Sequence, residues 1–122
     1  LRLGLEPLAG GPVIGTCTLF DFVPDSRRCE IGYALGSAHW GRGLMHEALS
    51  AAIAEAFSPR FNLHRLQAAY QPTNVRSAAV LARLGFEQEG LARDYLFING
   101  AWRDHCISAL RNPGFFRPSS WL

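Results

Sequence analysis

Two stretches of the chain show the spacing of apolar residues that is typical of a helix. In the first, apolar side chains recur every four positions, at Met45, Leu49, Ile53 and Phe57. This period places them on one face of a helix that ends near Ser58-Pro59. The second stretch starts after Asn74, a residue suited to cap the first turn, and stops at Gly85, a residue suited to a left-handed helix end.

Runs rich in β-branched and other apolar residues predict strands around these helices. We expect strands over residues 13–20, 29–35, 63–70, 95–98 and 101–110. The turn sequence Pro24-Asp25-Ser26 predicts a hairpin between the first two, and Asn99-Gly100 predicts one between the last two. The order strand, strand, helix, strand, helix, strand, strand indicates an α/β or α+β domain with a mixed sheet.

Composition favours an ordinary folded domain over residues 1–122. The chain is 48% hydrophobic and 18% charged, and its formal net charge of +2 comes with no basic run. We therefore expect neither direct nucleic-acid binding nor membrane association, and no apolar run reaches the roughly 18 residues of a membrane span. The chain begins at Leu1, in an apolar, strand-like stretch, and reads as the continuation of a longer protein.

The cysteines and histidines do not have the spacing of a metal site. Cys17, Cys29 and Cys106 are few and widely separated, which is typical of reduced core thiols in a cytoplasmic protein. The pair His105-Cys106 suggests a thiol nucleophile with its base, but successive strand residues face opposite sides of a sheet, which argues against it. We expect no metal.

A glycine-rich turn precedes the first helix. Gly41-Arg42-Gly43 lies between a predicted strand and a predicted helix, a layout in which unpaired backbone N–H groups can hold an anion. A dinucleotide-binding fingerprint would need glycine where His46 stands, and the Gly-Lys-Ser/Thr of a P-loop is absent. The turn therefore predicts a phosphate cradle of another type.

Three motifs then point to one family. The runs from Glu30 to Leu35 and from His39 to Leu49 resemble the main acetyl-CoA motif of the GNAT N-acetyltransferases, with Trp40 where Gln or Arg is usual and Met45 where Gly or Ala is usual. The run from Asn74 to Gly90 resembles the family's second motif. The tail from Arg93 to His105 is similar to the RimJ type, within the RimJ/RimL branch that acetylates ribosomal-protein alanines.

The resemblance implies a mixed, mostly antiparallel GNAT sheet flanked by helices. Members normally begin with a further strand and two helices, so the resemblance implies a single domain that is partial at its N-terminus. It also implies acetyl-CoA as cosubstrate, direct transfer to an amine, and as acceptor the N-terminal alanine of a ribosomal protein. The residues implied to bind the cofactor are Tyr33, Ala34, Leu35, Gly41, Arg42, Gly43, Leu44, Met45, His46, Asn74 and Ser77.

Two residues are the candidates for proton transfer. Many relatives protonate the leaving thiolate with a tyrosine seven positions after the asparagine, but Leu81 stands there, and Ser77 is the candidate that the ribosomal branch suggests. Glu30 is the candidate base, acting directly or through water. We expect Asp104 and His105 to form a solvated face or a salt bridge.

Two other functions share these motifs. One is a small-molecule amine N-acetyltransferase with the same fold, and the other is a module that binds acetyl-CoA without transferring it. The sequence alone does not choose the acceptor.

Overall fold

The structure is a computed structural model that describes residues 2–5, 14–40 and 43–121. Within these residues, six strands form one sheet, and two helices connect strands along the chain. In chain order the elements are β1 (Arg2–Leu5), β2 (Gly15–Val23), β3 (Arg28–Leu35), α1 (Leu44–Ala56), β4 (Arg65–Tyr70), α2 (Val75–Arg83), β5 (Glu87–Ile98) and β6 (Ala101–Arg111), with 3-10 turns at Pro24–Ser26 and Ser37–His39.

The sheet is mixed, as the order of elements predicts. Its strands lie in the order β1-β2-β3-β4-β6-β5, and every neighbouring pair is antiparallel except β3 and β4, which run parallel. A parallel pair requires a crossover connection, and α1 supplies it. The two outer groups of three strands are therefore joined only at the centre of the sheet.

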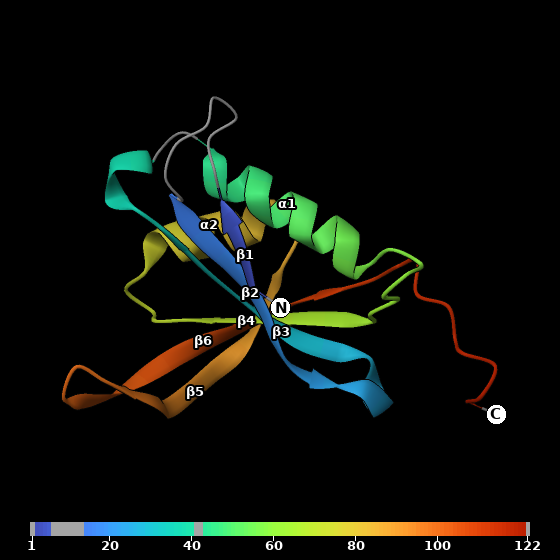
Figure 1. Cartoon of the computed structure of the whole chain (residues 1–122). Coiled ribbons are helices and arrows are strands. Elements are labelled where there is room, and N and C mark those ends of the chain that lie inside the picture. The colour runs from blue at the N-terminus through green and yellow to red at the C-terminus, as the bar shows by residue number, and fades with distance from the viewer. Residues whose placement is uncertain (1, 6–13, 41–42, 122) are drawn as a thin grey trace.

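This central junction is short. The pairing of β3 with β4 runs from Arg28 opposite Arg65 to Glu30 opposite Gln67, although β3 continues to Leu35 and β4 to Tyr70. Figure 1 shows the two strands separating toward the left of the view, so that the sheet opens into a V. Beyond Glu30 and Gln67 the two strands are therefore not paired with each other.

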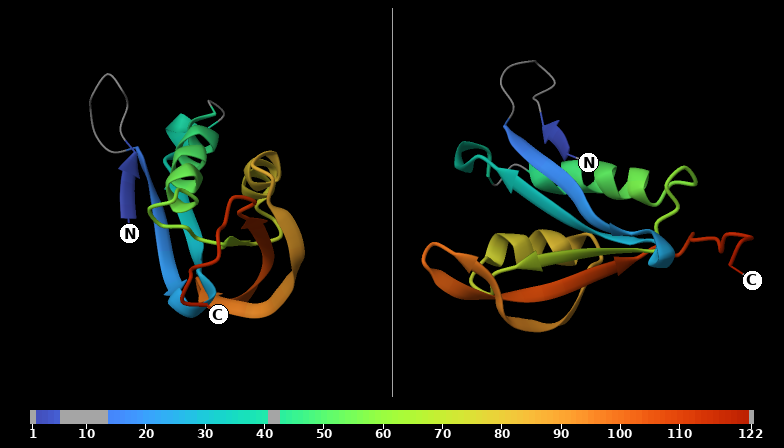
Figure 2. Two further views of the ribbon diagram at one scale, coloured as in Figure 1. Left: turned by 90° about the vertical axis from the view of Figure 1, so that its right-hand side faces the viewer. Right: turned by 60° about the horizontal axis from the view of Figure 1, so that its bottom comes forward.

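Both helices cover the same face of the sheet (Figure 2). Leu49 and Leu81, from the two helices, are each 1% exposed and share one core cluster with Leu66 of β4 and Cys17 of β2. This face carries the hydrophobic core. The opposite face carries the alternate residues of the same strands, among them Glu30 and Gln67.

The ends of α2 follow the predicted chemistry closely. The Asn74 side-chain oxygen accepts a hydrogen bond from the backbone N–H of Ser77 at 3.1 Å, which is an N-cap. Gly85 has φ +93°, and the backbone N–H of Phe86 donates to the carbonyl oxygen of Leu81 at 3.0 Å. Together these are the left-handed stop and back-bonded end of a Schellman motif.

The two hairpins are also confirmed, with one element longer than predicted. Asn99 and Gly100 have φ of +50° and +79°, the signs that a two-residue turn of this kind requires. However, β5 begins at Glu87, not at residue 95. Its first half is polar and mostly exposed, so no hydrophobic alternation marks it, and pairing with β6 is what makes it a strand.

All three cysteines are buried and free of disulfides, in line with reduced core thiols. In the part of the chain that the structure describes, no helix is long and apolar enough to cross a membrane. Nor do the described His, Cys, Asp and Glu side chains form a group that could hold a metal ion.

Candidate active site

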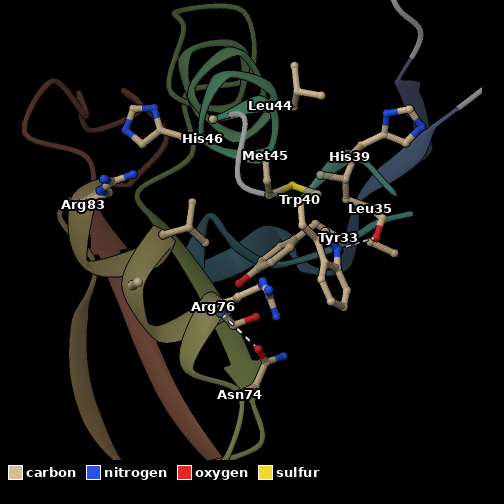
Figure 3. A pocket seen from close by; sticks show the side chains of 15 residues that line it. Tyr33, Leu35, His39, Trp40, Leu44, Met45, His46, Asn74, Arg76 and Arg83 are labelled. Carbon is tan, nitrogen blue, oxygen red and sulfur yellow. Dashed lines mark hydrogen bonds between the residues drawn. The ribbon is translucent and has the colours of Figure 1, made fainter. Parts of the chain in front are cut away.

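A cavity of about 580 Å³ lies between the start of α1, the face of α2 and the free end of β3. Its volume is within the range of small-molecule sites. Figure 3 shows Tyr33 reaching from β3 toward the start of α2, where Arg76 extends toward the ring of Trp40. The cavity is lined by Tyr33, Ala34, Leu35, His39, Trp40, Gly43, Leu44, Met45, His46, Asn74, Arg76, Ser77, Ala79, Val80 and Arg83.

The structure brings most of the predicted cofactor-binding residues together. Gly41 and Arg42 lie outside the described residues, and all the other predicted cofactor-binding residues line this one cavity. They come from three elements, β3, α1 and α2, that are distant in the sequence. The motifs therefore converge in space.

The charge of the lining suits an anion. Arg76, Arg83, His39 and His46 all line the cavity, and among the described lining residues there is no aspartate or glutamate. The cavity also includes Gly43, where α1 begins and its backbone N–H groups lack helical partners. These features fit the phosphates of acetyl-CoA, and the open edge of β3 fits its peptide-like arm.

The backbone conformation at Gly43 explains why this position requires glycine. It has φ +70°, a left-handed value that side-chain-bearing residues rarely adopt, while a Cβ built at this position would meet no atom within 4 Å. The glycine is therefore needed for the sharp entry into α1, and the space around it is open.

Trp40 occupies a position that the sequence marked as unusual. Its indole N–H donates to the backbone carbonyl of Leu35 at 2.9 Å, and the guanidinium carbon of Arg76 lies 4.0 Å from the ring centroid. The tryptophan thus links the end of β3 to the first turn of α2 across the mouth of the cavity. Met45, the other departure, lines the cavity while packing against the core.

Two hydroxyl groups meet inside the cavity. Ser77 is only 8% exposed. Desolvation by burial raises the pKa of Tyr33, and a hydrogen bond from Ser77 lowers it by a smaller amount, so that the pKa stays raised overall. Leu81, at the position where many relatives carry tyrosine, is instead packed in the core. Tyr33 was expected only as one of the cofactor-binding residues, and the contact of its phenol with Ser77 was missed because the two residues lie on different elements.

Glu30 does not line this cavity. It faces the opposite side of the sheet, where it lines a smaller hollow of about 240 Å³ beside the rungs at which β3 and β4 pair. Its Oε1 accepts hydrogen bonds from Gln67 Nε2 and from the Tyr95 hydroxyl, both at 3.1 Å. Burial, and then a hydrogen bond with Asp21, raise the pKa of Glu30, whereas Tyr95 and Gln67 lower it.

The prediction of a solvated face was wrong for His105, whereas Asp104 stays partly exposed. His105 is buried, at 5% exposure, and the Asp104 carboxylate accepts a hydrogen bond from the backbone N–H of Asp94 at 2.9 Å. His105 thus belongs to the buried part of the hairpin, whereas Asp104 binds the backbone of β5 at the bulge between Ala92 and Leu96.

Comparison with known proteins agrees with this geometry. The model of the acetyltransferase (GNAT) domain matches residues 3–87, well over half of the chain. The chain belongs to the GNAT family. Its Escherichia coli relative, the ribosomal protein uS5-alanine N-acetyltransferase, is 47% identical over 102 residues, covering 83% of this chain and 52% of that protein.

Two solved GNAT structures share the architecture. The ribosomal-protein-S5-alanine acetyltransferase of Vibrio fischeri superimposes with a TM-score of 0.82 at 40% identity, covering 86% of this chain and 57% of that one. Mycobacterium smegmatis RimJ, solved in complex with CoA-disulfide, gives a TM-score of 0.80 at 36% identity, covering 90% and 53%. The chain thus spans little more than half the length of these relatives.

Proposed function

We propose that this GNAT chain binds acetyl-CoA in the cavity between α1 and α2 and takes part in acetyl transfer to the N-terminal alanine of a ribosomal protein. The observation that carries the proposal is that a cavity with arginines and without aspartate or glutamate among its described lining residues lies beside the open edge of β3. In this reading, Arg76, Arg83 and the start of α1 hold the phosphates. The separated end of β3 holds the pantetheine arm.

The two faces of the sheet would supply the two reactants. Acetyl-CoA supplies a thioester that an amine can attack directly, and an α-amino group with a pKa of about 8 is partly neutral near pH 7. Glu30, on the face away from the cavity, would take the proton that the amine gives up. Its raised pKa keeps it closer to that of the amine than an exposed glutamate would be.

The leaving thiolate needs a proton from the cavity side. Leu81 cannot give one, so we assign this role to the Ser77 hydroxyl, with the Tyr33 phenol beside it. Replacing Ser77 by Ala is expected to lower kcat by a larger factor than it raises the Kd of acetyl-CoA. Equal losses in both would assign Ser77 to binding instead.

The acceptor assignment rests on likeness alone. Relatives at 47% and 40% identity are named for acetylating the alanine of ribosomal protein S5, which supports an N-terminal alanine here. Mass spectrometry of short Ala-starting peptides, incubated with the chain and acetyl-CoA, is the test. Faster acetylation of lysine side chains or of free polyamines would favour a small-molecule or side-chain acceptor. Saturable binding without transfer to any amine would identify a binding module.

Binding itself is tested by calorimetry with acetyl-CoA, alongside a CoA analogue that lacks the acetyl group. Micromolar, saturable binding is expected. Arg83→Ala should weaken it about threefold to tenfold, since a charge-assisted hydrogen bond of a partly exposed group is worth roughly 1 kcal/mol. Arg60→Ala is the matched control, because Arg60 is exposed outside the cavity, where it pairs with Glu55 at 3.5 Å and lies over the Phe61 ring at 5.2 Å. A folded sample without binding would refute the proposal.

A further inference from the structure

The carboxylate of Glu30 is held from two sides by side chains that the family motifs do not explain. Gln67, opposite it on β4, donates to Oε1 at 3.1 Å, and the Tyr95 hydroxyl donates to the same oxygen at 3.1 Å. Two donors on one oxygen fix the plane of the carboxylate.

The orientation of Gln67 is itself fixed. Arg65 Nη2 donates to Gln67 Oε1 at 3.1 Å, and the same guanidinium is paired with Glu89 through contacts of 2.6 and 2.9 Å. Because the amide oxygen faces a cation, its nitrogen must face Glu30. The amide therefore acts as a donor to the carboxylate in this arrangement.

Tyr95 reaches Glu30 only because β5 is irregular. Between the pairs Ala92–His105 and Leu96–Arg103, three residues of β5 stand opposite the single residue Asp104. Asp94 has φ +48°, and its backbone N–H is held by the Asp104 carboxylate at 2.9 Å. Bulges of this kind re-aim side chains, often next to active sites.

The bulge places Tyr95 at the open end of the sheet. The Tyr95 ring packs against the ring of His105, with 5.4 Å between the ring centroids. His105 is adjacent to Cys106, which pairs with the last residue of β4. Glu30 belongs to the last rung at which β3 and β4 still pair. The hydrogen bond from Tyr95 therefore draws the Glu30 carboxylate toward the opening between the strands.

We infer that Tyr95 is a positioning residue, which orients the Glu30 carboxylate at the opening of the sheet so that it can accept the proton of the acceptor amine. The inference rests on the proposed function, in which Glu30 is the base. Tyr95 does not touch acetyl-CoA in this arrangement, because it lies on the face opposite the cavity. Its effect passes through Glu30.

Other charged groups also face the hollow around Glu30. Asp21, turned inward by a bulge in β2 at which its φ is +53°, shares a hydrogen bond with Glu30 that opposes ionisation. Arg28 and Arg65 line the same hollow, and His105 contacts the Tyr95 ring. These groups stay in place when only the Tyr95 hydroxyl is removed, so a change can be attributed to that hydroxyl.

The variant Tyr95→Phe removes the hydroxyl and keeps the ring that packs on His105. Its matched control is Tyr70→Phe, which removes a phenol bound to Gln88 at 3.4 Å on the core side of β4. The Glu30 carboxyl is titrated directly by carbon-13 NMR in both variants. Because the Tyr95 hydrogen bond lowers the pKa of Glu30, that pKa should rise in Tyr95→Phe and stay unchanged in Tyr70→Phe.

The second readout is the pH profile of acetyl transfer. Since Glu30 works in its ionised form, a raised pKa moves the acid limb of kcat/KM to higher pH. A positioned base contributes roughly 10²- to 10⁴-fold, so we expect about a tenfold loss on that limb and a smaller loss at alkaline pH. The Kd of acetyl-CoA should not change.

The outcomes separate the two proposals. An unchanged Glu30 titration in Tyr95→Phe overturns the positioning role, whether or not the chain is active. A shifted titration with an unmoved acid limb also overturns it, because Tyr95 would then act on a carboxylate that is not the base. Failure of the wild-type chain to bind acetyl-CoA would refute the proposed function instead, and the NMR comparison would still decide whether Tyr95 controls Glu30.

Discussion

Substitutions at Asn74 are predicted to rank differently in stability and in ligand affinity. Its side-chain oxygen caps α2 by accepting from the N–H of Ser77 at 3.1 Å, while the amide nitrogen is not used by the cap. The residue also lines the cavity, where that nitrogen can donate to the arm of acetyl-CoA. Substitutions that keep one atom and remove the other separate the two roles.

Asn74→Ala removes both atoms. Losing the cap should cost about 1 kcal/mol of unfolding free energy. With an unfolding entropy of roughly 2.1 cal/mol/K per residue over 122 residues, this corresponds to a Tm lower by about 4 °C. Losing the donor should weaken acetyl-CoA binding by about twofold to tenfold, the range of one ordinary hydrogen bond.

Asn74→Asp keeps an oxygen at the cap position. Aspartate caps helices as well as asparagine does, and its charge is favourable at a helix N-terminus, so the Tm should equal or slightly exceed that of wild type. Its carboxylate cannot donate and would repel an anionic ligand, so the affinity should fall further than in Asn74→Ala.

Urea or thermal unfolding measures the order of stability among the wild type, Asn74→Ala and Asn74→Asp. Calorimetry with acetyl-CoA measures the order of affinity among the same three proteins. Stability should fall in the order Asp, Asn, Ala at this position, and affinity in the order Asn, Ala, Asp. Wild-type affinity in Asn74→Asp would refute the cofactor contact. Wild-type stability in Asn74→Ala would refute the energetic role of the cap.

Three further outcomes are expected. Leu81→Ala should lower the urea-unfolding free energy by about 2–5 kcal/mol because the side chain is 1% exposed, whereas Val75→Ala, at 72% exposure, should change it by less than about 0.5 kcal/mol. Burial raises the pKa of Cys29 to about 11. At pH 9 the thiolate fraction of Cys29 is therefore about fifty-fold lower in the folded chain than in the unfolded chain, and iodoacetamide should label this thiol only in urea. Arg76→Ala should change the fluorescence of Trp40, which it contacts at 4.0 Å, and blunt its response to acetyl-CoA.

Local chemistry explains which elements could be predicted from the sequence. The cap at Asn74, the left-handed stop at Gly85 and the turn at Asn99-Gly100 each depend on one or two residues whose conformational preference is strong. α1 depends on a four-residue period over 13 residues. Such features need no knowledge of the rest of the chain.

Long-range pairing explains what the sequence did not reveal. The first half of β5 has no apolar alternation and is a strand because β6 lies beside it. The bulges at Asp21 and Asp94 follow no fixed pattern, since aspartate tolerates positive φ without requiring it. Hence the meeting of Tyr95 with Glu30, across 65 positions of the chain, was beyond sequence reasoning.

The motif residues show the same division. Residues of the glycine turn and of the Asn74 run were expected at one site on the strength of resemblance, and those described do line one cavity. The pairing of Ser77 with Tyr33 was not expected, because it depends on the packing angle between α2 and β3. Family motifs thus locate the residues of the proposed cofactor cavity better than the proposed proton-transfer groups.

The short junction between β3 and β4 unites these observations. If the two strands paired along their full length, their backbone groups would be satisfied by each other, and the sheet would wall off the cavity from Glu30. Pairing instead ends at the rung of Glu30 and Gln67, so the cavity beside Tyr33 and Ser77 faces one side of the opening and the carboxylate faces the other. An amine arriving from the Glu30 side would meet a thioester arriving from the cavity side within this opening. The helices and the bulges then orient side chains toward this opening from both faces of the sheet.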